Sequence, residues 1–171
     1  GADVNHGRGT VRINHHNCIT PIFIACWCHF THIVKVLLDA EADPNSTCHK
    51  GHSSPMMASF FGANRQDPGK TAQSSLTVKH LVGLLLEHSA EVNGRPTSTQ
   101  RKLSSSVFEA ASGLHLGALR LLLDRRASVN VIDIFGRTPL DLAKKRPTNI
   151  IRYCVIKALQ MEADNQSEES Y

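Results

Sequence analysis

The chain has 171 residues, of which 41% are hydrophobic, and this is enough apolar side chain for one continuous core. Its 19 basic and 15 acidic residues give a net charge of +4, a mild excess that by itself neither indicates nor excludes a nucleic-acid partner. The sequence shows no secretory signal and no apolar run of the roughly 18 residues that a membrane-spanning helix needs. Its five cysteines are an odd number, which favours free thiols in a reducing compartment. We therefore expect an intracellular protein, cytoplasmic or nuclear, without a membrane segment.

The segment 20–45 predicts two helices joined by a turn. Thr20 can cap a helix start with its hydroxyl group, and Pro21 suits the first helical position because its missing N–H leaves nothing unpaired. A second helix is predicted by an apolar stripe that must be buried against another element: Ile33, Val34, Leu37 and Leu38. Two short helices cannot bury that stripe alone, so copies stacked side by side are expected.

Copies of this pattern follow along the chain. The second helix and its exit are repeated at 81–93 and 118–130, and the opening is repeated at 136–143. The chain itself begins with Gly1-Ala2-Asp3-Val4-Asn5, which matches the end of such a unit. These residues resemble the ankyrin repeat of about 33 residues. The resemblance covers roughly residues 1–160 and implies an all-α solenoid of stacked helix–turn–helix units with hairpin-like turns.

The resemblance divides the chain into four repeats. Residues 1–12 are expected to be the end of a preceding repeat with an extended hairpin, in what we interpret as a fragment of a longer protein. The four repeats are expected at 13–45, 46–93, 94–130 and 131–160. The last of them has a polar outer face, which is typical of a terminal cap. Residues 161–171 are acidic and low in apolar content, so we expect a disordered tail.

Each of the first three repeats departs from the ankyrin pattern. Phe23 replaces the usual His and is expected to be packed. In the second repeat we align Ser54-Pro55 with the usual Thr-Pro, which leaves about 15 surplus residues at 63–77. That stretch is polar and has no apolar periodicity, so it is predicted to be a surface loop. The third repeat is degenerate, because Ser105-Ser106 stands in place of Thr-Pro.

Two motifs resemble ligand sites, but their contexts argue against that interpretation. Zinc favours Cys and His at short spacings, as in Cys26-Trp27-Cys28-His29 with His32, and Cys48-His49 with His52. However, Cys26 falls on a position that the family fills with a small buried Ala, and the Cys-x2-Cys spacing is missing. The segment Pro68-Gly69-Lys70-Thr71 ends like a phosphate loop but lacks its first Gly and a preceding strand. We expect no metal and no cofactor.

Two basic motifs remain. Lys144-Lys145-Arg146-Pro147 could act as a nuclear import signal or bind acidic partners, although such runs are more often solvated helix faces. Arg101-Lys102-Leu103-Ser104 matches a basic-directed phosphorylation pattern, and short matches of this kind are often accidental. No arrangement pairs a nucleophile with a base, so catalysis is not expected.

The resemblance implies a binding surface on the concave side, built from hairpin tips and exposed positions of each first helix. Carried over position by position, it gives these residues: Ile24, Trp27 and Cys28; Ala58 and Phe61; Glu109 and Ser112; Leu142, Lys145 and Arg146. We predict that Trp27, the single Trp, forms an exposed apolar patch with Ile24 and Phe61, because Trp and Arg dominate interface hot spots. The alternative is that the loop at 63–77 folds over and buries Trp27 and Phe61.

The sequence therefore predicts a non-catalytic protein–protein interaction module, a scaffold or adaptor. We expect it to be monomeric, to bind another protein on its concave surface and to take no small-molecule substrate, with nucleic acid an improbable partner. The alternative function is a nuclear regulatory module. It would associate with acidic partners or nucleic acid through the basic fourth repeat, and its binding would depend steeply on salt.

Overall fold

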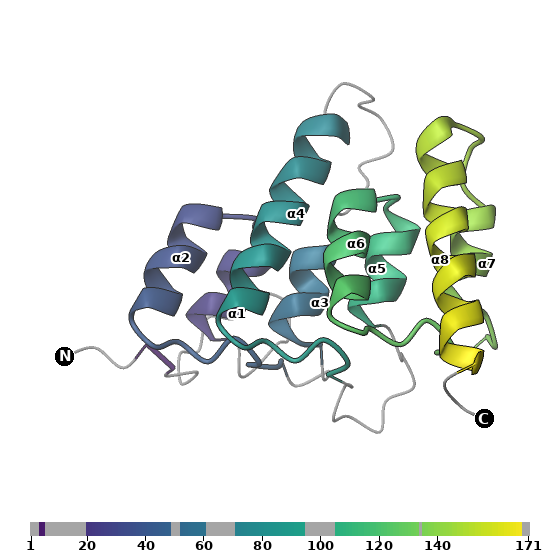
Figure 1. Cartoon of the computed structure of the whole chain (residues 1–171). Helices are drawn as coiled ribbons and strands as arrows, with labels where there is room; N and C mark the ends of the chain where they lie inside the picture. The colour runs from purple at the N-terminus through teal and green to yellow at the C-terminus, as the bar shows by residue number, and fades with distance from the viewer. Residues whose placement is uncertain are drawn as a thin grey trace.

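The described part of the computed structural model forms eight α-helices in two layers (Figure 1). The description covers residues 4–5, 20–48, 52–60, 71–94, 105–133 and 135–168. One layer holds four short helices: α1 (Pro21–Trp27), α3 (Ser54–Ser59), α5 (Ser106–Ser112) and α7 (Pro139–Lys144). The other layer holds α2 (Thr31–Asp39), α4 (Thr71–Glu87), α6 (Leu116–Asp124) and α8 (Ile150–Glu168). Each helix packs against the next one in its layer, which confirms the predicted all-α solenoid of stacked helix pairs.

Each short helix begins at a residue whose hydroxyl group caps it. The hydroxyl oxygen accepts a hydrogen bond from the backbone N–H three residues further on, at distances between 3.2 and 3.4 Å. The four capping residues are Thr20, Ser53, Ser105 and Thr138. Four helix starts of one chemistry, at one place in each unit, give the stack its regular layer of short helices.

The cap of α3 corrects the alignment of the second unit by one residue. Ser53, and not Ser54, stands at the place of Thr20. Pro55 is tolerated one position later than Pro21 because the N–H groups of the whole first turn lack a partner within the helix. Ser54 is fully buried instead, and its hydroxyl group donates to the Ser46 carbonyl oxygen at 3.2 Å.

The core lies between the two layers and between successive units. Helix α2 contributes Val34 and Leu38 to the core, and both are buried. Phe23 on α1 is only 2% exposed, so it is packed as the sequence predicts. Ile33 departs from the prediction, because it is 47% exposed, and Leu37 is only partly buried. The apolar stripe of α2 is therefore wider than the face that the described part of the chain covers.

The helix α4 is longer than its neighbours α2 and α6 and begins at Thr71. The prediction of a loop over 63–77 is therefore wrong for 71–77, while 61–70 lie outside the described residues. Val78 is fully buried and packs α4 against the hydrophobic core. Residues added in front of a helix that is already packed need no new nucleation, so a polar stretch can continue it.

The helix α8 extends to Glu168, so the prediction of a disordered tail is wrong for 161–168. Gln166 explains the order of this segment. Its side-chain amide donates to the carbonyl oxygen of Ala127 at 2.9 Å, and its amide oxygen accepts from the N–H of Val129 at 3.3 Å. These bonds fasten the end of α8 to the turn that follows α6.

Three asparagines, Asn5, Asn45 and Asn93, each link one exit turn to the next. In each case the side-chain oxygen accepts from a backbone N–H of the following exit turn, and the side-chain NH2 donates to a carbonyl oxygen two residues earlier. The bonds are those of Asn5 to Asp43 N and Glu41 O (2.7 and 3.3 Å), Asn45 to Glu91 N and Ser89 O (2.6 and 3.5 Å), and Asn93 to Ser128 N and Arg126 O (2.8 and 3.2 Å). The spacing between units is thus fixed by hydrogen bonds between Asn side chains and the backbone, as well as by apolar packing.

The same exit turns hold non-glycine residues in left-handed backbone. Glu41, Ser89 and Arg126 have φ angles of 62°, 64° and 59°, in the region where a Cβ atom meets the backbone. Each of them lies two residues after the end of the second helix of its unit and provides the carbonyl oxygen that an Asn side chain binds. The array tolerates this local strain because the Asn bonds and the packed helices determine the turn from both sides.

Candidate functional site

The predicted binding residues lie along the layer of short helices, four, seven or eight positions after each capping residue. With Ser53 as the cap, the positions four and seven residues further on are Met57, which is buried, and Phe60, which directly follows α3. The assignment of Ala58 to the surface is wrong, because Ala58 is fully buried. Phe61 lies outside the described residues. The one-residue alignment error is the reason why Phe60, which is 42% exposed, was missed.

Trp27 and Phe60 form the apolar part of this surface, and we call them the aromatic pair. Both are 42% exposed, whereas the alternative with an overlying loop required a buried Trp27. They occupy the same position on the neighbouring helices α1 and α3, whose axes are expected to lie about 8–10 Å apart. The ring of Trp27 meets the buried ring of Phe23 edge-on, with centroids 6.5 Å apart. This contact holds the indole ring in place while part of it remains exposed to solvent.

A hydrogen bond joins the two helix ends that carry the aromatic pair. The Nε2 atom of His29 lies 3.1 Å from the carbonyl oxygen of Phe60. Burial lowers the pKa of His29, and the Phe60 carbonyl opposes that effect by favouring the protonated ring. The bond fixes the ends of α1 and α3 relative to each other, and with them the spacing of the aromatic pair.

The opposite end of the short-helix layer is basic. Lys144 and Lys145 are exposed at the end of α7. Arg146 is half-buried, and its guanidinium donates to the hydroxyl oxygen of Ser112 on the neighbouring unit at 2.9 Å. Arg146 therefore serves partly as a link between units, while the two lysines are the cations that face solvent.

The remaining predicted positions are half-buried and flank these two ends. They are Ile24 on α1, Glu109 on α5 and Leu142 on α7. Ser112 is half-buried as well, and Cys28 at the end of α1 is exposed. The structure thus places an apolar end, an intervening carboxylate and a basic end along one layer of the solenoid.

The Cys and His residues of the first unit are dispersed between core and surface. Cys26 is completely buried, and burial raises the pKa of its thiol to about 12, so it behaves as a small apolar group. Cys28 is exposed, and His29 faces Phe60. Across the described ranges, no group of three or more His, Cys, Asp or Glu residues could hold a metal ion.

His115 is a buried ionisable group in the third unit. It is 4% exposed and precedes α6. Its pKa is lowered to about 4, first by burial and then by the positive charges of His29 and Arg146. A Cβ atom on Gly113 would lie 2.3 Å from His115 Nε2, so the glycine is what makes room for the imidazole.

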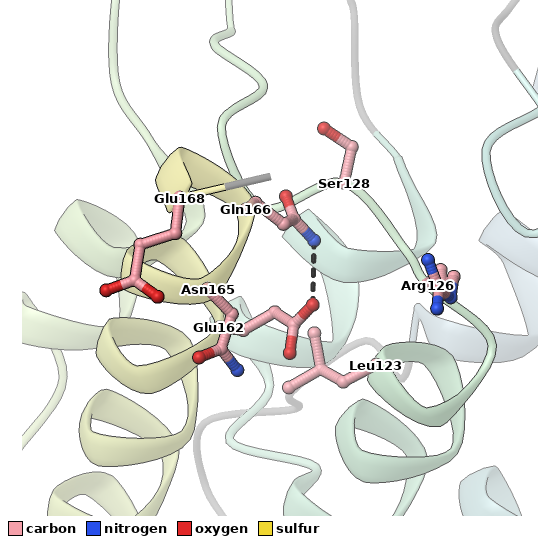
Figure 2. Close-up of a pocket in the computed structure, with 7 residues that line it drawn as sticks. All are labelled: Leu123, Arg126, Ser128, Glu162, Asn165, Gln166 and Glu168. Carbon is pink, nitrogen blue, oxygen red and sulfur yellow. Dashed lines mark hydrogen bonds between the residues drawn. The ribbon is translucent and has the colours of Figure 1, made fainter. Parts of the chain in front are cut away.

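A hollow of about 660 Å³ lies where the end of α8 meets α6 and its exit turn (Figure 2). Seven residues line it: Leu123, Arg126, Ser128, Glu162, Asn165, Gln166 and Glu168. Figure 2 shows Gln166 turned toward Glu162, to which it donates a hydrogen bond at 2.9 Å. Sequence reasoning missed this hollow because one of its walls is the end of α8, which was predicted to be part of a disordered tail.

These observations define a class of protein: a solenoid of repeated helix pairs with capped short helices, left-handed exit turns and Asn links between units. The model of the ankyrin repeat family matches residues 17–49. Cyclin-dependent kinase 4 inhibitor B of Rattus norvegicus is 31% identical over 121 residues, which are 70% of this chain and 78% of that protein. The chain belongs to the ankyrin-repeat family.

Two further relatives show how widely the array is shared. The putative ankyrin repeat protein YahD of Escherichia coli (strain K12) is 26% identical over 172 residues, which are 92% of this chain and 69% of that protein. Alpha-latrocrustotoxin-Lt1a of Latrodectus tredecimguttatus is 23% identical over 156 residues, and these cover 80% of this chain but only 11% of the toxin. Ankyrin repeats are in general non-catalytic protein–protein interaction modules. Within the parts that the structure describes, no helix combines the length and the apolar character that crossing a bilayer requires.

Proposed function

We propose that this chain is a scaffold or adaptor module that binds a partner protein on its layer of short helices, with the aromatic pair as the anchor. The observation that carries the proposal is the exposure of Trp27 and Phe60 at equivalent positions of neighbouring units. Each ring leaves apolar surface in water, and exposed aromatic patches on folded domains mark interaction sites. Trp is also among the residues that contribute most to binding energy at interfaces.

The same surface offers a basic end that sets the orientation of the partner. Lys145, with Arg146 beside it, would attract carboxylate groups of the partner. Ile24 and Leu142 would add apolar contact area to the surface. Such rim charges change association rate and specificity more than affinity. The partner segment is therefore one with apolar side chains at one end and acidic side chains at the other. Glu109 lies between the two ends and disfavours acidic groups in the middle of the segment.

The relatives support a protein partner. The rat relative is, by its name, an inhibitor of cyclin-dependent kinase 4, and the two chains align over most of their lengths. An array of this size can thus act on another protein. The kinase itself is not carried over to this chain, because the residues proposed here for binding are read from this chain alone.

The test is affinity capture from cell lysate with mass spectrometry. It compares the wild-type chain with Trp27→Ala and Phe60→Ala at low and high salt. The matched control is Tyr153→Ala, which removes an exposed aromatic ring from α8, in the other layer. Circular dichroism first establishes that every variant is folded. A partner retained by wild type and control but lost by both test variants at both salts supports the proposal.

A second candidate function, binding of acidic partners or nucleic acid through the fourth repeat, is favoured by the exposure of Lys144 and Lys145. In the same experiment its signature is different. Its partners would survive both aromatic substitutions and be stripped by salt, because contacts to phosphates release counterions. That result would refute the aromatic pair as the anchor.

A further inference from the structure

Asn93 is followed directly by Gly94, and these two residues are able to react with each other. The backbone nitrogen of the residue after an Asn can attack the side-chain carbonyl carbon of that Asn. Gly hinders this attack least, because it has no Cβ atom. No other Asn of the sequence is followed by Gly. Asn93 is exposed in the structure, so water has access to the reacting atoms.

The reaction replaces the side-chain amide of Asn93 by a carboxylate, and water is the only other reactant. The Gly94 nitrogen forms a bond to Cγ of Asn93, its proton passes to Nδ2, and ammonia leaves as the Cγ–Nδ2 bond breaks. Water then opens the resulting succinimide ring at either of its carbonyl carbons. Opening at Cγ gives aspartate. Opening at the backbone carbonyl carbon gives isoaspartate, in which the main chain runs through the former side chain.

The folded chain holds the amide group of Asn93 at both ends. Its Oδ1 atom accepts a hydrogen bond from Ser128 N at 2.8 Å, and its Nδ2 atom donates to Arg126 O at 3.2 Å. Both partners belong to the exit turn of the third unit, whereas Asn93 and Gly94 belong to the second. The reacting carbon therefore lies between two bonds that cross the junction between these units.

We propose that Asn93 is a site of spontaneous deamidation that reacts when the junction between the second and third units opens. The bonds to Ser128 and Arg126 slow the reaction in the closed junction, because the side chain must leave them to bring Cγ to the Gly94 nitrogen. The product does not restore the link. A carboxylate has no N–H to donate to the Arg126 carbonyl oxygen and places negative charge beside it. Deamidation thus makes a transient opening of the junction permanent.

The experiment follows deamidation of the whole chain over time by peptide mass spectrometry, which detects the replacement of NH2 by OH at position 93. The matched variant is Gly94→Ala, which keeps Asn93 and its bonds and hinders only the attacking nitrogen. A Cβ atom on Gly94 would lie 3.5 Å from its nearest neighbours, which are atoms of Glu91, so the alanine fits. Position 93 is expected to react several-fold more slowly in Gly94→Ala than in the wild type.

A second variant, Val131→Gly, tests whether the bonds across the junction control the reaction. It places a glycine after Asn130, an exposed Asn that stands at the equivalent place of the third unit. Position 130 is then expected to deamidate about tenfold faster than position 93 in the folded chain. A factor of ten corresponds to about 1.4 kcal/mol, which two hydrogen bonds can supply. In denaturing urea both bonds of Asn93 are lost, so the two rates should converge.

Three outcomes would overturn the proposal. If position 93 reacts no faster in the wild type than in Gly94→Ala, Asn93 and Gly94 are not a reactive pair. If position 93 reacts as fast in the folded chain as in urea, the junction does not control the reaction. The deamidated chain, separated by ion exchange, is expected to have a urea midpoint about 0.5 M lower than the unreacted chain. Equal midpoints would mean that deamidation leaves the junction intact.

Discussion

Acidification is expected to destabilise this protein through His115. The imidazole is 4% exposed, and its pKa is lowered from the ordinary 6.5 to about 4. Between these two values the unfolded chain binds a proton at this side chain and the folded chain does not. Stability is therefore fully present above pH 6.5 and is lost as the pH falls toward 4.

The size of the effect follows from the two pKa values. Between pH 7.5 and pH 5 the linkage for one such group lowers the free energy of unfolding by about 2 kcal/mol. The pKa of His29 is also lowered by burial, so its contribution has the same sign. The assay is urea denaturation at both pH values for the wild type and for His115→Gln, which removes the titrating group.

The wild type is expected to lose about 2 kcal/mol more than His115→Gln over this pH interval. The readout is the difference between two pH values within each chain, so a uniform loss of stability in the variant does not affect it. His80→Gln, at an exposed position of α4, controls for the removal of a histidine as such. An equal pH dependence in wild type and His115→Gln would refute the argument from burial.

Three substitutions test the links between units by urea denaturation. Ser89→Gly is expected to raise the free energy of unfolding by about 0.5–1 kcal/mol, because glycine adopts the left-handed backbone of this turn without a Cβ clash; Ala40→Gly, at a φ of −93°, should lower it instead. Asn93→Ala is expected to lower the free energy of unfolding by about 1 kcal/mol, because two hydrogen bonds to the next exit turn are lost. The control is Asn130→Ala, at an exposed position, and a similar loss of stability there would contradict the explanation. Gln166→Ala should lower the free energy of unfolding by about 1 kcal/mol as well, and no change would mean that the end of α8 is held by other contacts.

Local chemistry made the short helices predictable from the sequence. Thr20 and Thr138 cap α1 and α7 as expected, and the apolar spacing located Val34 and Leu38 in the core. The start of α3 was not determined in the same way. The run Ser53-Ser54-Pro55 offers two hydroxyl caps, and Pro fits either register. In the structure Ser53 is the cap, and the hydroxyl group of Ser54 instead binds the carbonyl oxygen of Ser46, eight residues earlier.

The one-residue uncertainty in the start of α3 also affected the prediction of the candidate site. A shift of one residue replaces Ala58 by Met57, which is also buried, and replaces Phe61 by Phe60, which is 42% exposed. The end of α8 could not be predicted for a related reason. Its composition is polar, and its order comes from Gln166 reaching a turn that is 39 residues away in the sequence.

The hydrogen bonds of the Asn side chains also make the contacts between units measurable by hydrogen exchange. The amide of Glu91 belongs to the second unit, but it is held at 2.6 Å by Asn45 of the first, and the amide of Ser128 is held in the same way by Asn93. Hydrogen exchange at such an amide is governed by the separation of neighbouring units, whereas exchange inside a helix follows the opening of that helix. Two backbone positions therefore measure how tightly successive units hold together, junction by junction, without any label being added.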